Sequence, residues 1–254
     1  MTHPQEHASG LAIQGFTPPL RLGDFKLIAF DMDSTLINIE CVDEIADLVG
    51  RKAEVAAITE ATMRGEIADF KASLRQRVAL LKGVSVGDIE RVYRERLQLN
   101  PGAALLVATC QKAGLKTLLV SGGFTFFTDR LQGQLNIDYT RSNVLQIQDG
   151  VLTGQMEDQP WGDICDGFEK RKMLVQTCAQ LGIAPSQAIA MGDGSNDVPM
   201  MEAAGLSVAY HAKLLCVHKP WWRLTAAGWI GCWRCLLNTP LWLPPEFWQT
   251  NQLV

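Results

Sequence analysis

The chain lacks the features of a membrane protein or a nucleic-acid-binding protein. No uninterrupted apolar run reaches the roughly 18 residues that cross a bilayer. The N-terminus shows no basic segment followed by an apolar stretch, so no secretory signal is visible. The formal net charge is −4 and no long basic run occurs, which gives no argument for an anionic membrane surface or a nucleic acid. We therefore expect a cytoplasmic protein that binds neither nucleic acid nor membrane.

The chain also lacks a cysteine pattern of the kind that builds a disulfide framework or a zinc site. Its seven cysteines are odd in number and scattered, which favours reduced thiols. Cys232 and Cys235 form a CxxC pair without a second pair, and we interpret them as incidental. With 254 residues the chain can bury a sizeable core as one domain, or as one domain with an insertion.

The order of apolar patterns predicts an α/β fold with an insertion. Residues 1–22 are polar and contain three prolines, so we expect a flexible N-terminal leader. Strands alternate with helices in residues 23–39 and 100–213, which predicts a Rossmann-like, mostly parallel sheet with helices on both faces. Residues 40–99 show helical periods without strands and are punctuated by glycines. We interpret this segment as a small helical cap inserted into the α/β core.

Polar clusters follow three apolar runs of the predicted sheet. Asp31 and Asp33 come directly after Leu27–Phe30, while Ser121-Gly122-Gly123 and the sequence GDGSND at 192–197 follow two later runs. The carboxyl ends of parallel strands meet at one edge of a sheet, where open α/β folds bind their ligands. Two carboxylates two residues apart on a strand point to opposite faces, so both can serve one site only if the chain turns. The cluster Asp33-Ser34-Thr35 is prone to such a turn.

Each cluster by itself has an ordinary explanation. A lone DxD fits a solvated strand end, and a serine followed by two glycines fits a turn. The sequence GDGSND resembles a fragment of a calcium-binding loop, although it lacks the later glutamate of such loops. The order of the clusters along the chain therefore carries the functional argument.

Taken in order, DMDST at 31–35, SGG at 121–123, a lysine on a predicted helix at 168–181 and GDGSND at 192–197 resemble the haloacid dehalogenase-like superfamily of phosphotransferases. The longer stretches FDMDSTLINIE, SLRQRV, GDGSNDVPM and AYHAK resemble the phosphoserine phosphatase family within it. The resemblance covers roughly residues 24–213. It implies Mg²⁺-dependent hydrolysis of O-phospho-L-serine to L-serine and phosphate through an aspartyl-phosphate, the last step of serine biosynthesis.

The resemblance also implies catalytic roles. Asp31 is expected to be the nucleophile. Asp33 is expected to protonate the leaving serine oxygen and later to take a proton from water, which requires a pKa near neutral. Mg²⁺ is expected on the Asp31 side chain, the Asp33 main-chain carbonyl and Asp193. Lys172 is expected to neutralise charge on the phosphoryl oxygens.

For the phosphate, the resemblance implies contacts from Ser121, the Gly122 amide and Asn196, with Asp197 supporting Lys172 or the water shell of the metal. Glycine at position 122 lets the backbone approach the phosphate closely.

For the amino-acid part of the substrate, it implies that Glu40 meets the ammonium and Arg77 grips the carboxylate with two hydrogen bonds. Met63 and Phe70 match positions that form an apolar wall, and Phe70 lies two helical turns before Arg77 on the same face. The chain is one residue longer than some relatives between Gly65 and Phe70, so the register is better defined at Arg77 than at Phe70.

The C-terminal segment, residues 214–254, departs from the family pattern. Six of the seven tryptophans follow Pro220, and only one acidic residue, Glu246, follows Glu202. The segment is either an aromatic tail that packs on the domain or a partner, or the product of a reading-frame shift after Lys213. A change of frame by one nucleotide turns the codons of Trp221-Trp222 into a valine codon and yields a sequence that resembles the family's ending. Sequencing the coding DNA distinguishes these interpretations.

Two other functions stay open at this point. One is a different small-molecule phosphatase or phosphotransferase of the superfamily, for example one that passes the phosphoryl group to homoserine. The other is a non-catalytic, metal-binding or partner-binding relic with a disrupted C-terminus. The expected partner is a small-molecule substrate, O-phosphoserine, and the expected oligomeric state is a monomer or a homodimer.

Overall fold

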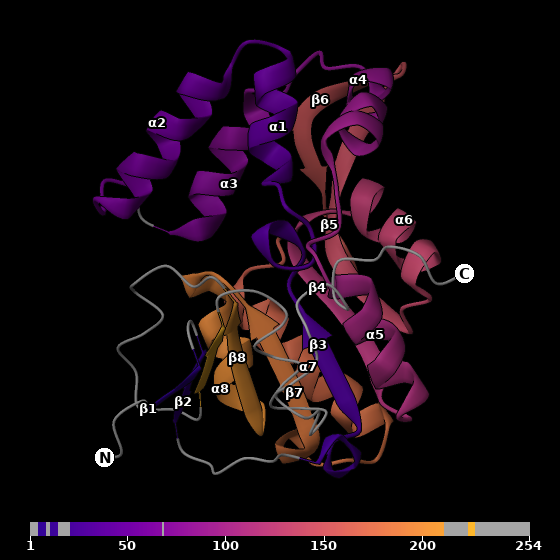
Figure 1. Ribbon diagram of the computed structural model, residues 1–254. Coiled ribbons are helices and arrows are strands. Elements are labelled where there is room, and N and C mark those ends of the chain that lie inside the picture. The colour runs from indigo at the N-terminus through magenta and orange to yellow at the C-terminus, as the bar shows by residue number, and fades with distance from the viewer. Residues whose placement is uncertain (1–4, 9–10, 15–20, 68, 211–222, 227–254) are drawn as a thin grey trace.

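The computed structural model describes residues 5–8, 11–14, 21–67, 69–210 and 223–226 (Figure 1). Within these residues the strands form one nine-stranded sheet with the order β1-β2-β9-β8-β7-β3-β4-β5-β6. The strands are β1 (Gln5–Ala8), β2 (Leu11–Gln14), β3 (Leu27–Phe30), β4 (Lys116–Phe124), β5 (Tyr139–Gln148), β6 (Val151–Glu157), β7 (Ala188–Gly192), β8 (Leu206–Tyr210) and β9 (Arg223–Ala226).

The sheet is mostly parallel, as predicted. Strand β3 lies between β4 and β7 and is parallel to both, and the pairs β4–β5, β7–β8 and β8–β9 are also parallel. Antiparallel pairing is confined to the two ends of the sheet, where β6 pairs with β5, β2 with β9 and β1 with β2. Strands β3, β7 and β8 are buried along their whole length. Their continuous apolar runs suit a sheet that is covered on both faces.

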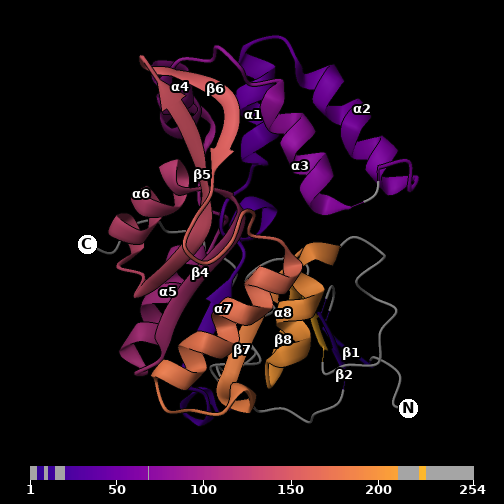
Figure 2. The ribbon, with the colours of Figure 1, turned by 180° about the vertical axis from the view of Figure 1, so that it is seen from behind.

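Helices cover both faces of the sheet, which confirms the predicted layers (Figures 1 and 2). Alternate residues of β3 serve different cores, because successive side chains of a strand point to opposite faces. Ile28 and Phe30 pack with helices α5 and α6, whereas Leu27 and Ala29 pack with helices α7 and α8. These helices are α5 (Ala103–Lys112), α6 (Thr125–Leu135), α7 (Gly167–Gln180) and α8 (Val198–Ala203).

The part of the chain from residue 41 to 96, called the cap below, is helical and lies above the carboxyl end of the sheet in Figure 1. Its elements are α1 (Cys41–Leu48), α2 (Lys52–Met63), α3 (Phe70–Ala79), α4 (Val86–Arg91) and the π-helical turn η3 (Val92–Arg96). Strand β6 runs alongside this segment: the Gly83 amide donates to the Leu152 carbonyl at 2.8 Å, and the Leu152 amide donates to the Val84 carbonyl at 2.8 Å. The hairpin of β5 and β6 therefore connects the cap to the sheet.

The N-terminal leader and the C-terminal segment contribute strands to the sheet where the structure describes them. Within the N-terminal leader, residues 5–8 and 11–14 form β1 and β2 at the edge of the sheet, and the predicted flexibility of the leader stays a prediction. In the C-terminal segment, Arg223–Ala226 forms β9, which is parallel to β8. The rest of residues 214–254, including the CxxC pair, lies outside the described residues. The frame-shift hypothesis stays a prediction.

None of the helices in the described part of the chain combines the length and the apolar character that crossing a membrane requires.

Candidate active site

The site is built around a turn that follows β3. The Asp31 amide donates to the Met191 carbonyl at 2.9 Å, which extends the pairing of β3 with β7 to this residue. The chain then turns through η2 (Met32–Leu36), in which Ser34 has a left-handed φ of 55°. The Ser34 hydroxyl donates to Glu40 Oε1 at 2.8 Å and fastens the turn to the beginning of the cap. This is the turn that the spacing of Asp31 and Asp33 requires.

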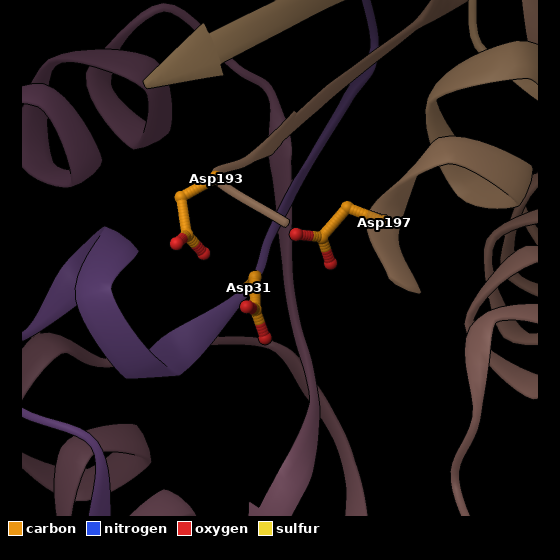
Figure 3. A group of neighbouring side chains, drawn as sticks. All are labelled: Asp31, Asp193 and Asp197. Atoms are coloured by element: carbon orange, nitrogen blue, oxygen red, sulfur yellow. The ribbon is translucent and has the colours of Figure 1, made fainter. Parts of the chain in front are cut away.

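Three buried carboxylates converge at this end of the sheet (Figure 3). Asp31, Asp193 and Asp197 each offer an oxygen, and these oxygens lie within 4.8 Å of one another. Asp193 follows β7, and Asp197 ends the 3₁₀ turn η5 (Ser195–Asp197). A Cβ at position 192 would overlap the Asp197 side chain, so glycine is required there. The structure brings together Asp31 and Asp193, as predicted, and adds Asp197 to the group.

The lysine of the site is Lys170, and the prediction of Lys172 in this position is wrong. Lys170 Nζ is fully buried and donates to Asp31 Oδ1 at 2.7 Å and to Asp197 Oδ1 at 2.6 Å. The Lys172 side chain is 48% exposed, and its Nζ donates to the Trp161 carbonyl at 3.0 Å. Residues two apart on an α-helix point in nearly opposite directions, so one helix cannot present both lysines to the site.

The sequence itself contains evidence that favours Lys170 over Lys172. The buried face of α7 includes Met173, Leu174 and Thr177. Lys170 precedes these residues by three, four and seven positions and so shares their face. Lys172 precedes Met173 and Leu174 by only one and two positions. Helical periodicity therefore favours Lys170 over Lys172.

The charges of the site call for a further cation. Burial, followed by the nearby charge of Asp197, raises the pKa of Asp31 well above its usual value, although Lys170 opposes the shift. Burial alone would lower the pKa of Lys170, but Asp197 and Asp31 outweigh it and the pKa lies above its usual value. Three carboxylates can carry more negative charge than the one positive charge of Lys170 balances. A hard divalent cation with oxygen ligands suits this donor set, because it would compensate the remaining negative charge.

Asp33 lies apart from the three carboxylates and faces the cap. Its Oδ1 atom is buried and has no hydrogen-bond partner among the described residues. Burial, followed by the charge of Glu40, raises the pKa of Asp33 to about 7, although a hydrogen bond from Cys41 opposes the shift. A carboxyl group with this pKa can both give and accept a proton near neutral pH. The surroundings of Asp33 therefore give it the near-neutral pKa that its predicted role requires.

Residues 121–123, called the phosphate loop below, belong to the end of β4, where its pairing with β5 shifts register, and they pack between the turn at Asp33 and the cap. Ser121 is buried, and its Oγ accepts a hydrogen bond from the Gly123 amide at 2.9 Å. A Cβ on Gly122 would lie 2.9 Å from Phe70 Cζ, and a Cβ on Gly123 would lie 3.3 Å from Asp33 Oδ2. A side chain at either position would crowd these neighbours, so glycine favours the close approach. The structure places Phe70 of the cap directly against the predicted phosphate loop.

Asn196 is half-buried in η5, between Asp193 and Asp197. Its side-chain oxygen lies so close to Gly194 that a Cβ at position 194 would overlap it. The predicted contact of Asn196 with phosphate stays a prediction.

Arg77 of α3 is half-buried and has an unpaired group. Its Nε atom is buried and has no hydrogen-bond partner among the described residues. Burial lowers the pKa of Arg77, and the charges of Asp43 and Glu40 oppose this shift. Asp43 was not predicted, although it lies three residues beyond Glu40 and so shares a helix face with it. Met63 ends α2 with 73% of its surface exposed, so the structure does not bury it in a pocket wall.

The chain is similar to proteins of one enzyme family. Residues 25–205 match the haloacid dehalogenase-like hydrolase family. The phosphoserine phosphatase of Albidiferax ferrireducens is 76% identical over 211 residues, which cover 83% of this chain and 89% of the relative. A solved structure described as a phospho-aspartyl intermediate analogue of phosphoserine phosphatase is 37% identical, with a TM-score of 0.69, and covers 75% of this chain and 88% of that one. A substrate-bound phosphoserine phosphatase complex is 33% identical, with a TM-score of 0.75, and the match covers 84% of this chain and 98% of that one.

Proposed function

The chain belongs to the haloacid dehalogenase-like hydrolases and, within them, to the phosphoserine phosphatases, and we propose that Asp31 is the residue that attacks the phosphorus of O-phospho-L-serine. The observation that carries this proposal is the buried contact of Asp31 with Lys170, next to Asp193 and Asp197 at the end of the central strand. A nucleophile in this place forms an aspartyl-phosphate as the bond from phosphorus to the seryl oxygen breaks.

The donor set fits Mg²⁺, because its ligands are hard oxygens and their negative charge exceeds that of the single lysine. We assign the side chains of Asp31 and Asp193 and the main-chain carbonyl of Asp33 to the metal. When bound there, Mg²⁺ supplies the positive charge that lets a carboxylate approach a phosphate dianion.

Lys170 takes the role that the sequence assigned to Lys172. Asp31 and Asp197 hold its ammonium group, so the positive charge is in place before the substrate arrives. A preorganised charge of this kind stabilises the negative charge that spreads over the phosphoryl oxygens during transfer. Ser121, the Gly122 amide and Asn196 provide the remaining contacts to these oxygens.

Asp33 moves the protons of both steps. In the first step, protonated Asp33 gives its proton to the seryl oxygen, and L-serine leaves. In the second step, the Asp33 carboxylate takes a proton from the water that attacks the aspartyl-phosphate, which releases phosphate and restores both aspartates. A pKa of about 7 supports this double role, because protonated and ionised forms are then both accessible near neutral pH.

The cap recognises the amino-acid part of the substrate. Glu40 is assigned to the ammonium group and Arg77 to the carboxylate. The buried Nε of Arg77, unpaired among the described residues, supports this assignment, since a buried donor without a partner carries a desolvation cost that a substrate carboxylate would remove. The Phe70 ring, which packs on Gly122, is assigned to the wall of the pocket.

Replacing Arg77 by alanine should lower kcat/KM for O-phospho-L-serine about 10²-fold, since the charged hydrogen bonds to the carboxylate are lost. A generic aryl phosphate has no such carboxylate, and its kcat/KM should change by less than about 3-fold. Arg75→Ala is the matched control, because Arg75 lies on the same helix, is 54% exposed and pairs with Asp163. Equal losses with both substrates would contradict the specificity assigned to Arg77.

A phosphate-release panel tests the function itself. Purified protein is given O-phospho-L-serine, O-phospho-D-serine, phosphothreonine and phosphotyrosine, with and without Mg²⁺. We expect release from O-phospho-L-serine to exceed the others and to stop when Mg²⁺ is chelated. Phosphoryl transfer to added homoserine in place of release would support a phosphotransferase, and folded protein without activity on any substrate would support a relic.

A further inference from the structure

Asn143 is a buried side chain for which the reaction has no assigned use. It lies on β5 and is 1% exposed. Its Nδ2 donates to the Gly122 carbonyl at 2.7 Å, and its Oδ1 accepts from the Cys165 amide at 2.8 Å. A buried side-chain amide whose NH₂ group donates to one segment and whose oxygen accepts from another holds the two segments at a fixed separation.

The first of these segments is the phosphate loop, and the hydrogen bond fixes the orientation of one peptide group. Because a peptide unit is planar and trans, a carbonyl that points to Asn143 directs the following N–H, that of Gly123, the opposite way. This N–H donates to Ser121 Oγ at 2.9 Å. The Ser121 hydroxyl thus accepts a hydrogen bond within the loop, and its own hydrogen is free to donate to a phosphoryl oxygen.

The second segment is the connection that leads into α7. Cys165 precedes Asp166, whose carboxylate caps α7 by accepting from the Glu169 amide at 2.9 Å. Lys170 is the next residue, in the first turn of the same helix. The side chain of Asn143 therefore joins the loop that carries Ser121 to the beginning of the helix that carries Lys170.

We propose that Asn143 is a positioning residue for phosphoryl transfer: it sets the Gly122–Gly123 peptide so that the Ser121 hydroxyl donates to the phosphoryl group. This inference rests on the proposed function, because it assigns to Ser121 the contact with phosphate. Asn143 itself touches no reacting atom and acts through the peptide.

Asn143→Asp tests the proposal with little change in shape. The carboxylate still accepts from the Cys165 amide, but it presents an acceptor instead of a donor to the Gly122 carbonyl, and the peptide is expected to rotate. We expect kcat for O-phospho-L-serine to fall about 10²-fold, the scale of losing one donor to a developing charge, while KM changes by less than about 3-fold. Ser142→Ala is the control, because it removes a buried hydrogen bond to Thr128 from the neighbouring position of β5.

A double-mutant cycle with Ser121→Ala separates positioning from a general loss of stability. If Asn143 acts through Ser121, Asn143→Asp should lower kcat less than about 3-fold further in the Ser121→Ala background. Losses that multiply, or Asn143→Asp with the wild-type kcat, would overturn the proposal. Asn143→Ala gives a second cycle if the aspartate variant does not fold. The wild-type and Ser142→Ala proteins must hydrolyse O-phospho-L-serine, and their inactivity would count against the proposed function instead.

Discussion

Replacing Asp31 by asparagine is expected to abolish phosphoserine hydrolysis while the fold is retained. Asparagine has nearly the same shape, but its amide does not form an acyl phosphate, so kcat should fall by about 10⁴-fold or more, the scale of losing a nucleophile. Phosphate release measures this loss. Acid-quenched protein that was exposed to ³²P-labelled phosphoserine should carry a covalent label in the wild type and none in Asp31→Asn.

The same substitution should leave the metal-free protein at least as stable as the wild type. The raised pKa of Asp31 means that the folded protein binds its proton more tightly than the unfolded chain. The free energy of unfolding therefore falls as the pH rises through this pKa and Asp31 ionises. An uncharged amide at position 31 avoids that loss. Thermal unfolding without metal should show an unchanged or higher Tm, and the increase in Tm on adding Mg²⁺ should be smaller than for the wild type.

Asp24→Asn is the control for these measurements, since it makes the same chemical change at an exposed carboxylate at the other end of β3. Its activity and its response to Mg²⁺ should match those of the wild type. A turnover of Asp31→Asn within about 10²-fold of the wild type would remove Asp31 from the role of nucleophile.

The centre of the fold was predictable because its signals are local and strong. The run Leu27–Phe30 has no polar residue, and such a run is buried on both faces, so its place in the middle of a parallel sheet follows. The helix at Ala103–Lys112 follows Pro101-Gly102 and is followed by Gly114, and the structure gives it these bounds. The turn after Asp31 was predicted from the spacing of the two aspartates and the turn-prone residues that follow.

The edges of the sheet were not predictable in the same way. Strands β1 and β2 have four residues each, and their partners are each other and β9, which is more than 200 residues away. Pairing of this kind is decided by tertiary context and leaves little trace in segments of four residues. The role of Asn143 was hidden for a similar reason, because its hydrogen bonds reach residues that are 21 and 22 positions away in the chain.

The choice between Lys170 and Lys172 shows that a motif residue on a helix is assigned more securely when helical periodicity is considered as well. A short run of charged residues at 169–172 offers several candidates, and a resemblance that shifts by two positions selects the wrong face of the helix. Burial distinguishes the two lysines, because only a charge that is paired on several sides is tolerated in the interior. The pairs of Lys170 with Asp31 and Asp197 meet that condition.

Replacing Lys170 by methionine is therefore expected to lower kcat about 10³-fold, because the positive charge beside the phosphoryl oxygens is lost. Asp31 and Asp197 would also lose a buried partner, which should lower the free energy of unfolding by about 3–5 kcal/mol. Phosphate release and thermal unfolding, both in the presence of Mg²⁺, measure the two effects.

Lys172→Met is the matched control, since it makes the same change two residues away on the exposed side of α7. It should keep kcat within about 2-fold of the wild type and change the free energy of unfolding by no more than about 0.5 kcal/mol. If Lys170→Met does not fold, the Lys172 variant alone still decides between the two residues, because full activity without Lys172 leaves Lys170 as the lysine that the structure places at Asp31. A large loss of kcat in Lys172→Met with a stable fold would instead return the role to Lys172, and the buried pairs of Lys170 would then serve the fold rather than the reaction.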